Sequence, residues 1–396
     1  MSGNGRPLKL AVIAGEESGD LLGADLVGAI KARLESDLDL IGVGGDHLQA
    51  EGLRSLFDPG IIAIMGVSAV VRDMPRLLRL IGSTARQVAA AKPDCVVTID
   101  SPAFNLRVAR KIRRLDPSIP IVKYVCPSVW AWLPGRAARM KAYTDHVLCL
   151  LPFEPAELER LGGPSGTFVG HRLTQHPGVL AARAMQEKRK SEAGGSMNLL
   201  LLPGSRRGEV AALAAPFVEA ANLLMARGHG LNVRIPTVPR VEAAVRTAAA
   251  KLNTDVEVTT GDEAKWRAFG TADAALAASG TVSLELALAG VPLISCYRSD
   301  PLMKLTYPLI STWSASLPNL IADSPIVPEF YDRFVRPQHL ARSIEAIGGD
   351  GPARKAQVQG FEKVRRALKT DRPAGEIAAE IVLRLAGARN LNVDTD

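Results

Sequence analysis

Short apolar runs alternate with helix-length amphipathic segments along this chain, and this alternation constrains the fold more than any other feature. In the first half, the apolar runs lie at 9–14, 39–43, 95–100, 121–125, 146–150 and 167–169. After a polar stretch they resume at 199–202, 231–236, 256–260, 274–279 and 292–297. Strands that alternate with helices form parallel sheets covered by helices on both faces. The sequence therefore predicts an α/β protein with two doubly wound, Rossmann-like sheets.

The length of 396 residues exceeds what one hydrophobic core usually holds, so two domains are expected. We place the N-terminal domain at 1–172, a linker at 173–197 and the C-terminal domain at 198–372. A final helix and tail, 373–396, can pack on either domain, including back on the N-terminal one. Because doubly wound domains bind ligands at the carboxyl ends of their strands, we expect a ligand cleft between the domains.

Composition narrows the kinds of partner. The net charge of +7 suits phosphates or an anionic membrane surface, although it also fits a surface that is merely solubilising. No recurring aromatic–basic pattern of the kind that stacks bases occurs, so no nucleic-acid partner is expected. The cysteines form no CxxC pair, no secretory signal is visible and no apolar run reaches about 18 residues. We therefore expect reduced thiols and a cytoplasmic protein.

The first apolar run ends in "AGEESGD", a glycine-rich turn of the kind that usually cradles a phosphate. Glu16, Glu17 and Asp20 would repel a phosphate, whereas carboxylates suit sugar hydroxyl groups. Gly15 and Gly19 allow close approach of the backbone to a ligand. The alternative is that some of these acids only cap the following helix.

Two turns in the second half suit a diphosphate better. In "LLLLPGSRR" an apolar strand runs into Gly204, Ser205 and Arg206, where a helix begins. Backbone N–H groups at a helix start, together with a guanidinium group, are suited to a pyrophosphate. The alternative is a tight turn with surface arginines.

The second of these turns is "ASGTVSLE", in which a small-residue strand ends and a helix begins at Ser279, Gly280 and Thr281. Glu285 lies one helical turn later on the same face, where its carboxylate can accept hydrogen bonds from both ribose hydroxyls. A capped helix with a surface glutamate is the alternative. Two phosphate-friendly turns in one domain favour a nucleotide site there.

Polar and aromatic groups also follow two strands of the first half. Asp100, at the carboxyl end of a strand, is well placed as a general base, although it can equally cap the next helix. Asn105 lies in that helix. Ser128, Trp130 and Trp132 follow the next strand, and the two tryptophans can stack on a sugar, line an apolar channel or belong to the core.

An apolar stretch at 60–71 leads into a segment with a basic face and an apolar face. Such a segment can rest on an anionic membrane, or it can cover the sheet as an ordinary amphipathic helix. The membrane interpretation predicts contacts from Met65, Val70, Arg72, Met74, Arg76, Leu77 and Arg79.

Several common site motifs are missing from the sequence. GxxxxGK[ST] and GxGxxG are both absent, which argues against a P-loop ATPase and a dinucleotide dehydrogenase. Neither HExxH spacing nor a Cys/His cluster occurs, so no metal ligands are predicted.

Taken in order, "AGEESGDLLGA", "IMGVS", "IDSPAFN", "YVCPSVWAW", "LLPGSRRGEV", "ASGTVSLE" and "SLPNL" resemble the motifs of the lipid-A-disaccharide synthase family. The resemblance covers about residues 10–325, and the set is specific although each motif is weak alone. It implies a GT-B fold, in which two Rossmann-like domains face a cleft. It also implies peripheral attachment to the cytoplasmic face of the inner membrane of a Gram-negative bacterium.

The reaction implied by the resemblance is an inverting transfer of 2,3-diacylglucosamine from its UDP derivative. The acceptor would be 2,3-diacylglucosamine 1-phosphate, and the product a β-1,6-linked disaccharide 1-phosphate. Asp100 matches the family's proposed base, and Arg206 and Glu285 match its UDP-contacting positions. Ala103 stands where the family usually has a second acid. The implied acceptor and lipid side comprises Gly15, Ser18, Gly19, Asp20, Asn105, Ser128, Trp130, Trp132 and Asn319.

The expected chemistry is a direct displacement in which Asp100, or alternatively Glu16 or Glu17, takes the proton of the acceptor's 6-hydroxyl. Arg206 and the helix start at 279–281 would stabilise the leaving diphosphate, so we expect neither metal nor cofactor. One alternative is another GT-B enzyme of UDP-sugars, such as an epimerase. The other is a non-catalytic UDP-sugar-binding module. The oligomeric state stays open.

Overall fold

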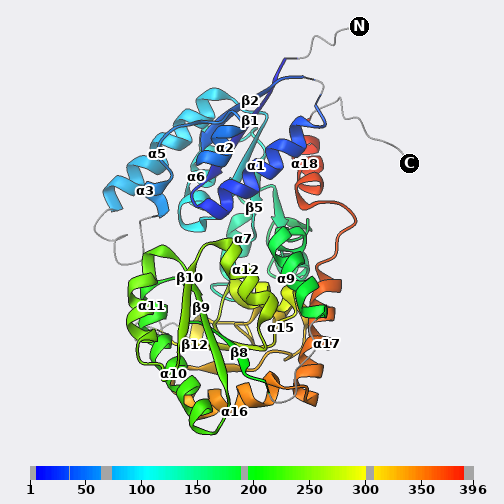
Figure 1. Cartoon of the computed structure of the whole chain (residues 1–396). Helices are drawn as coiled ribbons and strands as arrows, with labels where there is room; N and C mark the ends of the chain where they lie inside the picture. The colour runs from blue at the N-terminus through cyan, green and yellow to red at the C-terminus, as the bar shows by residue number, and fades with distance from the viewer. Residues whose placement is uncertain (1–5, 35, 64–73, 189–194, 300–306, 388–396) are drawn as a thin grey trace. The chain divides into compact units, whose positions relative to one another are not determined.

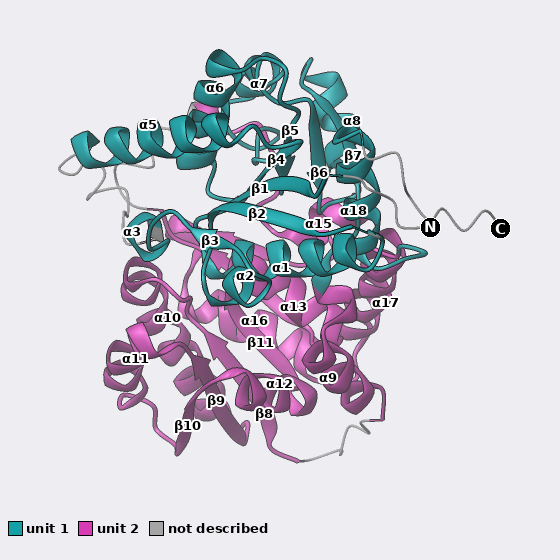
Figure 2. Cartoon of the chain, turned by 90° about the horizontal axis from the view of Figure 1, so that it is seen from above, with its two compact units in different colours: residues 1–172, 370–396 teal, residues 173–369 magenta. Residues whose placement is uncertain are grey.

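The computed structural model describes residues 6–34, 36–63, 74–188, 195–299 and 307–387. The chain divides into two compact units, which are coloured separately in Figure 2. Unit 1 comprises residues 1–172 and 370–396, and unit 2 comprises residues 173–369.

Unit 1 is built on a seven-stranded sheet in the order β3-β2-β1-β4-β5-β6-β7, and every pair of neighbouring strands is parallel. Its strands are β1 (Leu8–Ala14), β2 (Leu38–Val43), β3 (Arg54–Ser55), β4 (Cys95–Ile99), β5 (Ile121–Tyr124), β6 (His146–Cys149) and β7 (Ser165–Phe168). Its helices are α1 (Glu17–Lys31), α2 (Asp46–Ala50), α3 (Gly60–Ala63), α5 (Met74–Ala91), α6 (Pro102–Leu115), α7 (Gly135–Met140), α8 (Glu154–Arg160) and α18 (Ala374–Leu385).

The two faces of this sheet are covered by different helices. Successive side chains of a strand point to opposite faces. Accordingly, Leu10 and Val12 of β1 pack in one cluster with α1 and α18, whereas Ala11 and Ile13 pack in another with α5 and α6. Figure 1 shows α18, at the end of the chain, beside α1 near its start. The C-terminal helix therefore packs back on the N-terminal unit.

Unit 2 is built on a six-stranded parallel sheet in the order β10-β9-β8-β11-β12-β13. Its strands are β8 (Met197–Leu202), β9 (Leu231–Thr237), β10 (Val256–Thr260), β11 (Ala274–Ala278), β12 (Leu293–Tyr297) and β13 (Glu329–Tyr331). Its helices are α9 (Pro177–Lys188), α10 (Arg207–Ala226), α11 (Glu242–Ala249), α12 (Asp262–Thr271), α13 (Thr281–Ala289), α15 (Leu317–Ala322), α16 (Pro337–Gly348) and α17 (Pro352–Ala367). Short 3₁₀ turns are η1 (Arg172–Gln175), η2 (Pro239–Val241), η3 (Tyr307–Leu309) and η4 (Asp332–Phe334).

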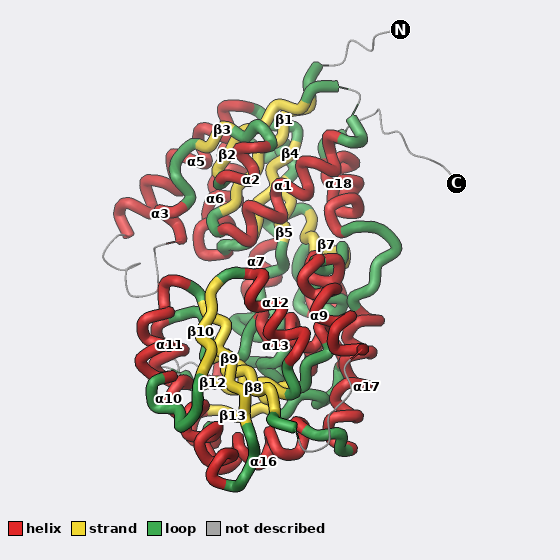
Figure 3. Tube along the Cα trace, in the orientation of Figure 1, coloured by secondary structure: helices red, strands yellow, loops and turns green. Residues whose placement is uncertain are grey.

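The alternation of strand and helix that the sequence predicts is visible along both units in Figure 3. Within each sheet, the strands that follow the first one are added on one side of it, and the later strands are then added on its other side. The crossing falls between β1 and β4 in unit 1 and between β8 and β11 in unit 2. Such a switch point leaves a crevice at the carboxyl ends of its two strands, where doubly wound folds bind their ligands. The prediction of two Rossmann-like sheets is confirmed.

The stretch expected to be a linker contains helix α9, which packs against α12 of unit 2. An added Cβ on Gly178 would lie 2.1 Å from Trp266 Cδ1, so the helix meets the indole with its backbone. Only Val179 and Ala182 of this helix are fully buried. The polar residues of helix α9 that suggested a linker lie on its outward face.

Only part of the segment assigned to a membrane surface lies within the described residues. Met65, Val70 and Arg72 lie outside the described residues. Leu77 is 5% exposed and belongs to the core cluster of α5 and α6, and Met74 packs against that cluster. The expected membrane contact of Leu77 is therefore wrong, because α5 turns this side of its apolar face to the sheet. Arg76 and Arg79 are exposed.

Among the described residues, one helix is long and apolar enough to cross a membrane, namely α10. Half of its apolar window is buried inside unit 2, where Leu213, Phe217 and Leu224 belong to the main hydrophobic cluster. Its composition is therefore accounted for by packing against the sheet.

Candidate active site

The switch point of unit 1 brings together the first glycine turn and the turn that carries Asp100. Ala14 of β1 pairs with Ile99 of β4, so Gly15 and Asp100 leave the sheet side by side. An added Cβ on Gly15 would lie 2.8 Å from Ser101 Oγ. A side chain at position 15 would press against Ser101, so glycine favours this close approach of the two turns.

Asp100 and Ser101 both adopt left-handed backbone conformations, with φ of 49° and 40°. Such conformations are costly for residues other than glycine and cluster at functional sites. The carbonyl oxygen of Asp100 accepts hydrogen bonds from Asn105 Nδ2 at 2.9 Å and from Lys123 Nζ at 2.6 Å. These two side chains hold the strained turn in place, and Asp100 itself is half-buried.

Asn105 is fully buried, and its Nδ2 also donates to the carbonyls of Ile99 at 2.7 Å and Ile13 at 3.3 Å. The amide thus ties the carboxyl ends of β4 and β1 together. The expectation that Asn105 contacts the acceptor is not supported by this arrangement, because its donor group is used by the backbone.

Lys123 was missed by sequence reasoning. It is 1% exposed in β5, and its Nζ lies 3.4 Å from the carbonyl of Thr98 and 3.2 Å from that of Tyr124, in addition to its bond with Asp100. Burial lowers the pKa of this amine to about 7, against the opposing effect of the Asp100 charge. The only signal was a lysine inside the apolar run "IVKYV".

The acids of the first glycine turn separate into two groups. Glu16 and Glu17 are exposed, with Ser18 between Glu17 and the buried Gly19. Asp20 is buried instead, and its carboxylate accepts the N–H groups of Gly45 at 2.7 Å and His47 at 2.9 Å. Asp20 therefore caps the start of α2, and its predicted place on the acceptor side is not supported, because its carboxylate is used by the backbone.

The tryptophan loop after β5 is tied to a buried acid. Trp130 is half-buried, and its Nε1 donates to Glu154 Oε1 at 3.3 Å. Glu154 Oε2 accepts the N–H groups of Leu150 at 3.1 Å and Leu151 at 3.0 Å. Burial raises the pKa of Glu154 to about 7, although these bonds oppose the shift. Trp132 is half-buried and Ser128 is exposed, so both are accessible in this unit.

Cys126, Cys149 and Glu154 are the group of described residues that comes nearest to a metal site. Their ligand atoms lie within 4.8 Å of one another, and all three are buried. A metal ligand must be deprotonated. The pKa of the Cys126 thiol is raised by its hydrogen bond with Cys149 and by burial, and that of the Glu154 carboxyl is raised by burial. Without a bound ion, both groups therefore hold their protons more strongly than they would in water.

In unit 2, the two turns expected to bind the diphosphate flank the other switch point. Leu202 of β8 pairs with Ala277 of β11, so the turns at 203–206 and 279–281 begin at the same edge of the sheet. The structure thus brings Gly204, Ser205 and Arg206 to the edge that also carries Gly280 and Thr281.

The first of these turns differs from the expectation in one respect. The N–H groups of Ser205 and Arg206 are not open, because Glu209 Oε2 accepts them at 2.9 Å and 3.2 Å. Glu209 Oε1 also lies 3.0 Å from the guanidinium of Arg206, whose side chain is 79% exposed. Arg240, which sequence reasoning missed, donates to the carbonyl of Ser205 at 2.8 Å and adds a second positive charge.

The second turn leads into α13. Ser279 Oγ donates to the carbonyl of Ala315 at 2.9 Å, which fixes the turn. Gly280 has a φ of 155°, and an added Cβ there would meet nothing within 4 Å. Thr281 is exposed at the first position of the helix. N–H groups in a first helical turn have no acceptor within the helix and suit an anion.

Glu285 is half-buried one turn further along α13, and its Oε1 lies 3.2 Å from Nζ of Lys265 in α12. Burial raises the pKa of Glu285, and Lys265 opposes the shift. The predicted ribose acceptor therefore has a cationic neighbour that sequence spacing did not reveal.

Asn319 lies in α15 of unit 2 and is 1% exposed. Its Nδ2 donates to the carbonyl of Val327 at 2.9 Å and to Glu329 Oε2 at 3.0 Å, and its Oδ1 accepts the N–H of Val327 at 2.7 Å. These bonds hold the approach to β13. The implied place of Asn319 on the acceptor side is not supported, because its amide is fully used in the core.

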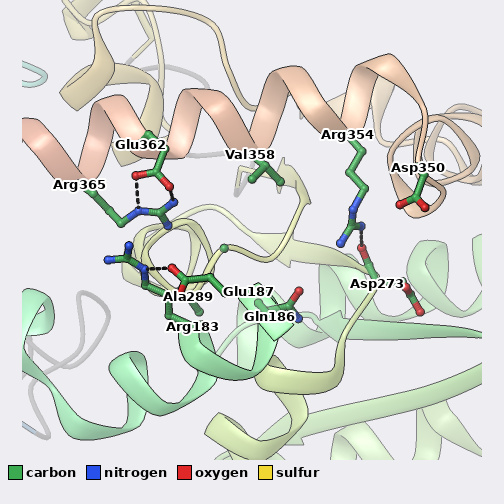
Figure 4. Close-up of a pocket in the computed structure, with 11 residues that line it drawn as sticks. Arg183, Gln186, Glu187, Asp273, Ala289, Asp350, Arg354, Val358, Glu362 and Arg365 are labelled. Atoms are coloured by element: carbon green, nitrogen blue, oxygen red, sulfur yellow. Dashed lines mark hydrogen bonds and ion pairs between the residues drawn. The ribbon is translucent and has the colours of Figure 1, made fainter. Parts of the chain in front are cut away.

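Unit 2 also contains a cavity of about 210 Å³, shown in Figure 4. Ion pairs form between residues of its lining: Arg183 pairs with Glu187 at 2.7 Å, and Arg365 pairs with Glu362. Asp273 and Gly290, which line it, lie just before β11 and β12. The cavity is therefore at the amino ends of the strands, away from the edge that carries the two turns.

The raised pKa of Glu154 makes a prediction for stability. The folded protein holds this proton up to about pH 7, whereas an unperturbed carboxyl loses it near 4.5. Because the folded state then binds more protons, this group's contribution to the free energy of unfolding falls as pH rises from about 4.5 to 7. Glu154→Gln cannot lose a proton, so its stability relative to wild type should rise across this window, as measured by urea unfolding.

Glu159→Gln, an exposed carboxylate of the same helix, is the control and should follow the wild-type pH dependence. His171, whose pKa burial lowers to about 4, gives a slope of opposite sign in every variant and cancels in the comparison. A constant difference between Glu154→Gln and wild type from pH 4.5 to 8 would contradict a buried, protonated Glu154.

Comparison with known proteins identifies the family. The family model for lipid-A-disaccharide synthetase matches residues 10–382. A lipid-A-disaccharide synthase from Rhodopseudomonas palustris is 45% identical over 375 residues, which cover 94% of this chain and 95% of that protein.

Solved structures share the fold at low identity. A UDP-GlcNAc 2-epimerase from Neisseria meningitidis, bound to UDP-GlcNAc, has a TM-score of 0.60 at 11% identity, covering 95% of this chain and 99% of that one. The MurG of Acinetobacter baumannii has a TM-score of 0.59 at 14% identity, covering 96% and 99%. These likenesses confirm the GT-B fold. With the family match over nearly its whole length, the chain belongs to the lipid-A-disaccharide synthetase family and is a glycosyltransferase that forms the lipid A disaccharide.

Proposed function

We propose that the protein transfers 2,3-diacylglucosamine, with inversion, from its UDP derivative to 2,3-diacylglucosamine 1-phosphate. The products are the β-1,6-linked disaccharide 1-phosphate and UDP. The observation that carries this proposal is the contrast between the two switch points. The edge of unit 2 offers exposed cationic and helix-start groups, whereas the edge of unit 1 offers the carboxylate of Asp100 on a rigidly held turn.

The donor is assigned to unit 2. Arg206, Arg240 and the first turn of α13 supply positive charge for the diphosphate, and Glu285 is one turn away for the ribose. Binding of UDP at Arg206 would replace its contact with Glu209, so the carboxylate holds the arginine until the nucleotide arrives. The neighbouring fold of an epimerase bound to UDP-GlcNAc supports a UDP-sugar as donor.

Asp100 is the proposed general base, with Glu16 or Glu17 as the alternatives at the same edge. Its carboxylate takes the proton of the acceptor's 6-hydroxyl as that oxygen attacks C1 of the donor sugar from the face opposite UDP. Charge then grows on the departing diphosphate, where the guanidinium groups and the helix start stabilise it. In this mechanism those groups do the work of a metal ion, and no cofactor is required.

The lipid substrates place the enzyme at the cytoplasmic face of the inner membrane in this proposal. Arg76 and Arg79 are exposed on α5, and Leu78 between them is 48% exposed. Basic side chains flanking an exposed apolar one suit an anionic bilayer surface. This support is independent of Leu77, which belongs to the core.

The reaction is tested by incubating the protein with the UDP-diacylglucosamine donor and measuring UDP release, with and without the 1-phosphate acceptor. We expect release only when both substrates are present, together with a disaccharide whose new linkage is β-1,6 by NMR. Conversion of the donor without acceptor would instead indicate epimerase-like chemistry. Tight UDP binding without any turnover would indicate a binding module.

The nucleotide site is tested at Gly204, which has a φ of 112°. An added Cβ would lie 2.5 Å from Cβ of Glu209, so Gly204→Ala must shift the turn that carries Arg206. We expect the affinity for UDP to fall by about tenfold or more, measured by isothermal titration calorimetry.

Gly208→Ala is the matched control for this variant. It makes the same chemical change four residues later, where an added Cβ meets nothing within 4 Å and alanine favours the helix. UDP affinity should stay at the wild-type value, and thermal unfolding of both variants shows whether the fold is kept. Wild-type affinity in a folded Gly204→Ala would remove this turn from the nucleotide site.

A further inference from the structure

Unit 1 contains a recess directly beside the turn that carries Asp100. It has a volume of about 680 Å³, within the range of small-molecule sites, and it is bounded by α6 and α7. Pro102 and Ala103, the first residues of α6, line its near end. Its walls carry four arginines, which are Arg107 and Arg110 of α6 and Arg136 and Arg139 of α7.

The positive charge of this recess is not balanced. No acidic side chain lines it, and within the described ranges none of the four arginines forms an ion pair. Arg107 donates to the carbonyl of Ala103, and Arg139 Nε to that of Gly135 at 3.2 Å, so both are used only by their own helices. By contrast, Arg113 of α6, outside the recess, pairs with Asp145.

Tyr143, which also lines the recess, lies near enough to three of these arginines for their charges to act on it. Burial raises the pKa of its hydroxyl, and the charges of Arg110, Arg139 and Arg136 all act on it in the opposite direction. Three guanidinium groups from two helices therefore act on one point of the lining. Guanidinium groups bind phosphate oxygens through paired, parallel hydrogen bonds, so such a cluster suits a phosphate.

The lining of the recess is also partly apolar. Leu106 is 8% exposed and packs with Ala137 and Met140 between the two helices, and Leu133 also lines the recess. Arginines beside apolar side chains are complementary to an amphiphile that carries a phosphate next to hydrocarbon. A free phosphate or a nucleic acid would leave the apolar side chains without a partner.

We propose that this recess binds the phosphate of the glycolipid acceptor. The assignment rests on the proposed function, in which the acceptor is a diacylated sugar phosphate. A helix rises about 1.5 Å per residue, so Arg107 lies about 7.5 Å along α6 from Pro102. The 1-phosphate and the 6-hydroxyl are carried at C1 and, through C6, at C5, the two carbons that flank the ring oxygen, so one site of this length can hold both groups. The arginines hold the phosphate end while the hydroxyl end lies at Asp100, so that the acceptor binds in one direction.

The test is equilibrium binding of two short-chain, monomeric ligands to the full chain in the absence of donor. One is 2,3-diacylglucosamine 1-phosphate, and the other is the same glycolipid without its phosphate. We expect wild type to bind the phosphorylated ligand about tenfold or more tightly. Arg110→Gln and Arg136→Gln should each reduce this preference about tenfold and leave the affinity for the dephosphorylated ligand unchanged.

Arg114→Gln is the matched control, because it removes the same charge from an exposed position of α6 outside the recess. It should keep the wild-type preference. An unchanged preference in Arg110→Gln and Arg136→Gln, or an equal loss of affinity for both ligands, would overturn the assignment. So would variants that keep the preference but lose flotation with phosphatidylglycerol vesicles, since the arginines would then face the bilayer.

Because the binding measurement involves no turnover, it separates this assignment from the proposed reaction. Phosphate-dependent binding that requires Arg110 and Arg136 supports the recess even if the protein released no UDP. Acceptor-dependent UDP release with no role for these arginines overturns the recess and leaves the reaction intact.

Discussion

A buried ammonium group and a buried amide hold the backbone of Asp100 by hydrogen bonds, and the proposed chemistry depends on these bonds. Lys123 Nζ and Asn105 Nδ2 both donate to the Asp100 carbonyl, at 2.6 Å and 2.9 Å. Two consecutive left-handed residues would otherwise relax toward an ordinary turn. The energetic cost of burying the amine appears in the lowered pKa of Lys123. The side chain of Asp100 is thereby positioned by the core.

The two units share one sheet topology, but the side chains at their switch points carry opposite charge. In each sheet the order in which strands are added switches sides once. Each switch point places two turns at the carboxyl ends of adjacent strands. In unit 1 these turns carry Glu16, Glu17 and Asp100. In unit 2 they carry Arg206, the nearby Arg240 and the start of α13. The proposed division into base and diphosphate site thus follows from which side chains occupy equivalent positions.

Sequence patterns were sufficient for the fold because both sheets are built from short apolar runs separated by helices. They also placed Asp100, Arg206 and Thr281 at the carboxyl ends of strands, since those residues lie within a few positions after a strand in the chain. They failed where a role depends on a partner distant in sequence. Asp20 caps a helix that begins at Asp46, and Lys123 binds carbonyls of β4 and of the turn after it. Glu209 accepts the N–H groups of Ser205 and Arg206, which the sequence suggested were free to bind a phosphate. Sequence spacing alone does not show the direction of its carboxylate.

The division of labour between the two edges is tested most directly by Asp100→Asn, since asparagine keeps the size of the side chain and tolerates the left-handed conformation. Steady-state turnover with both substrates and the dissociation constant of UDP are measured on the same preparation, with Glu159→Gln as the exposed carboxylate control. We predict that turnover in Asp100→Asn falls at least about a hundredfold while UDP affinity stays within about twofold of wild type. Turnover near the wild-type value would contradict the account, because the base would then lie elsewhere.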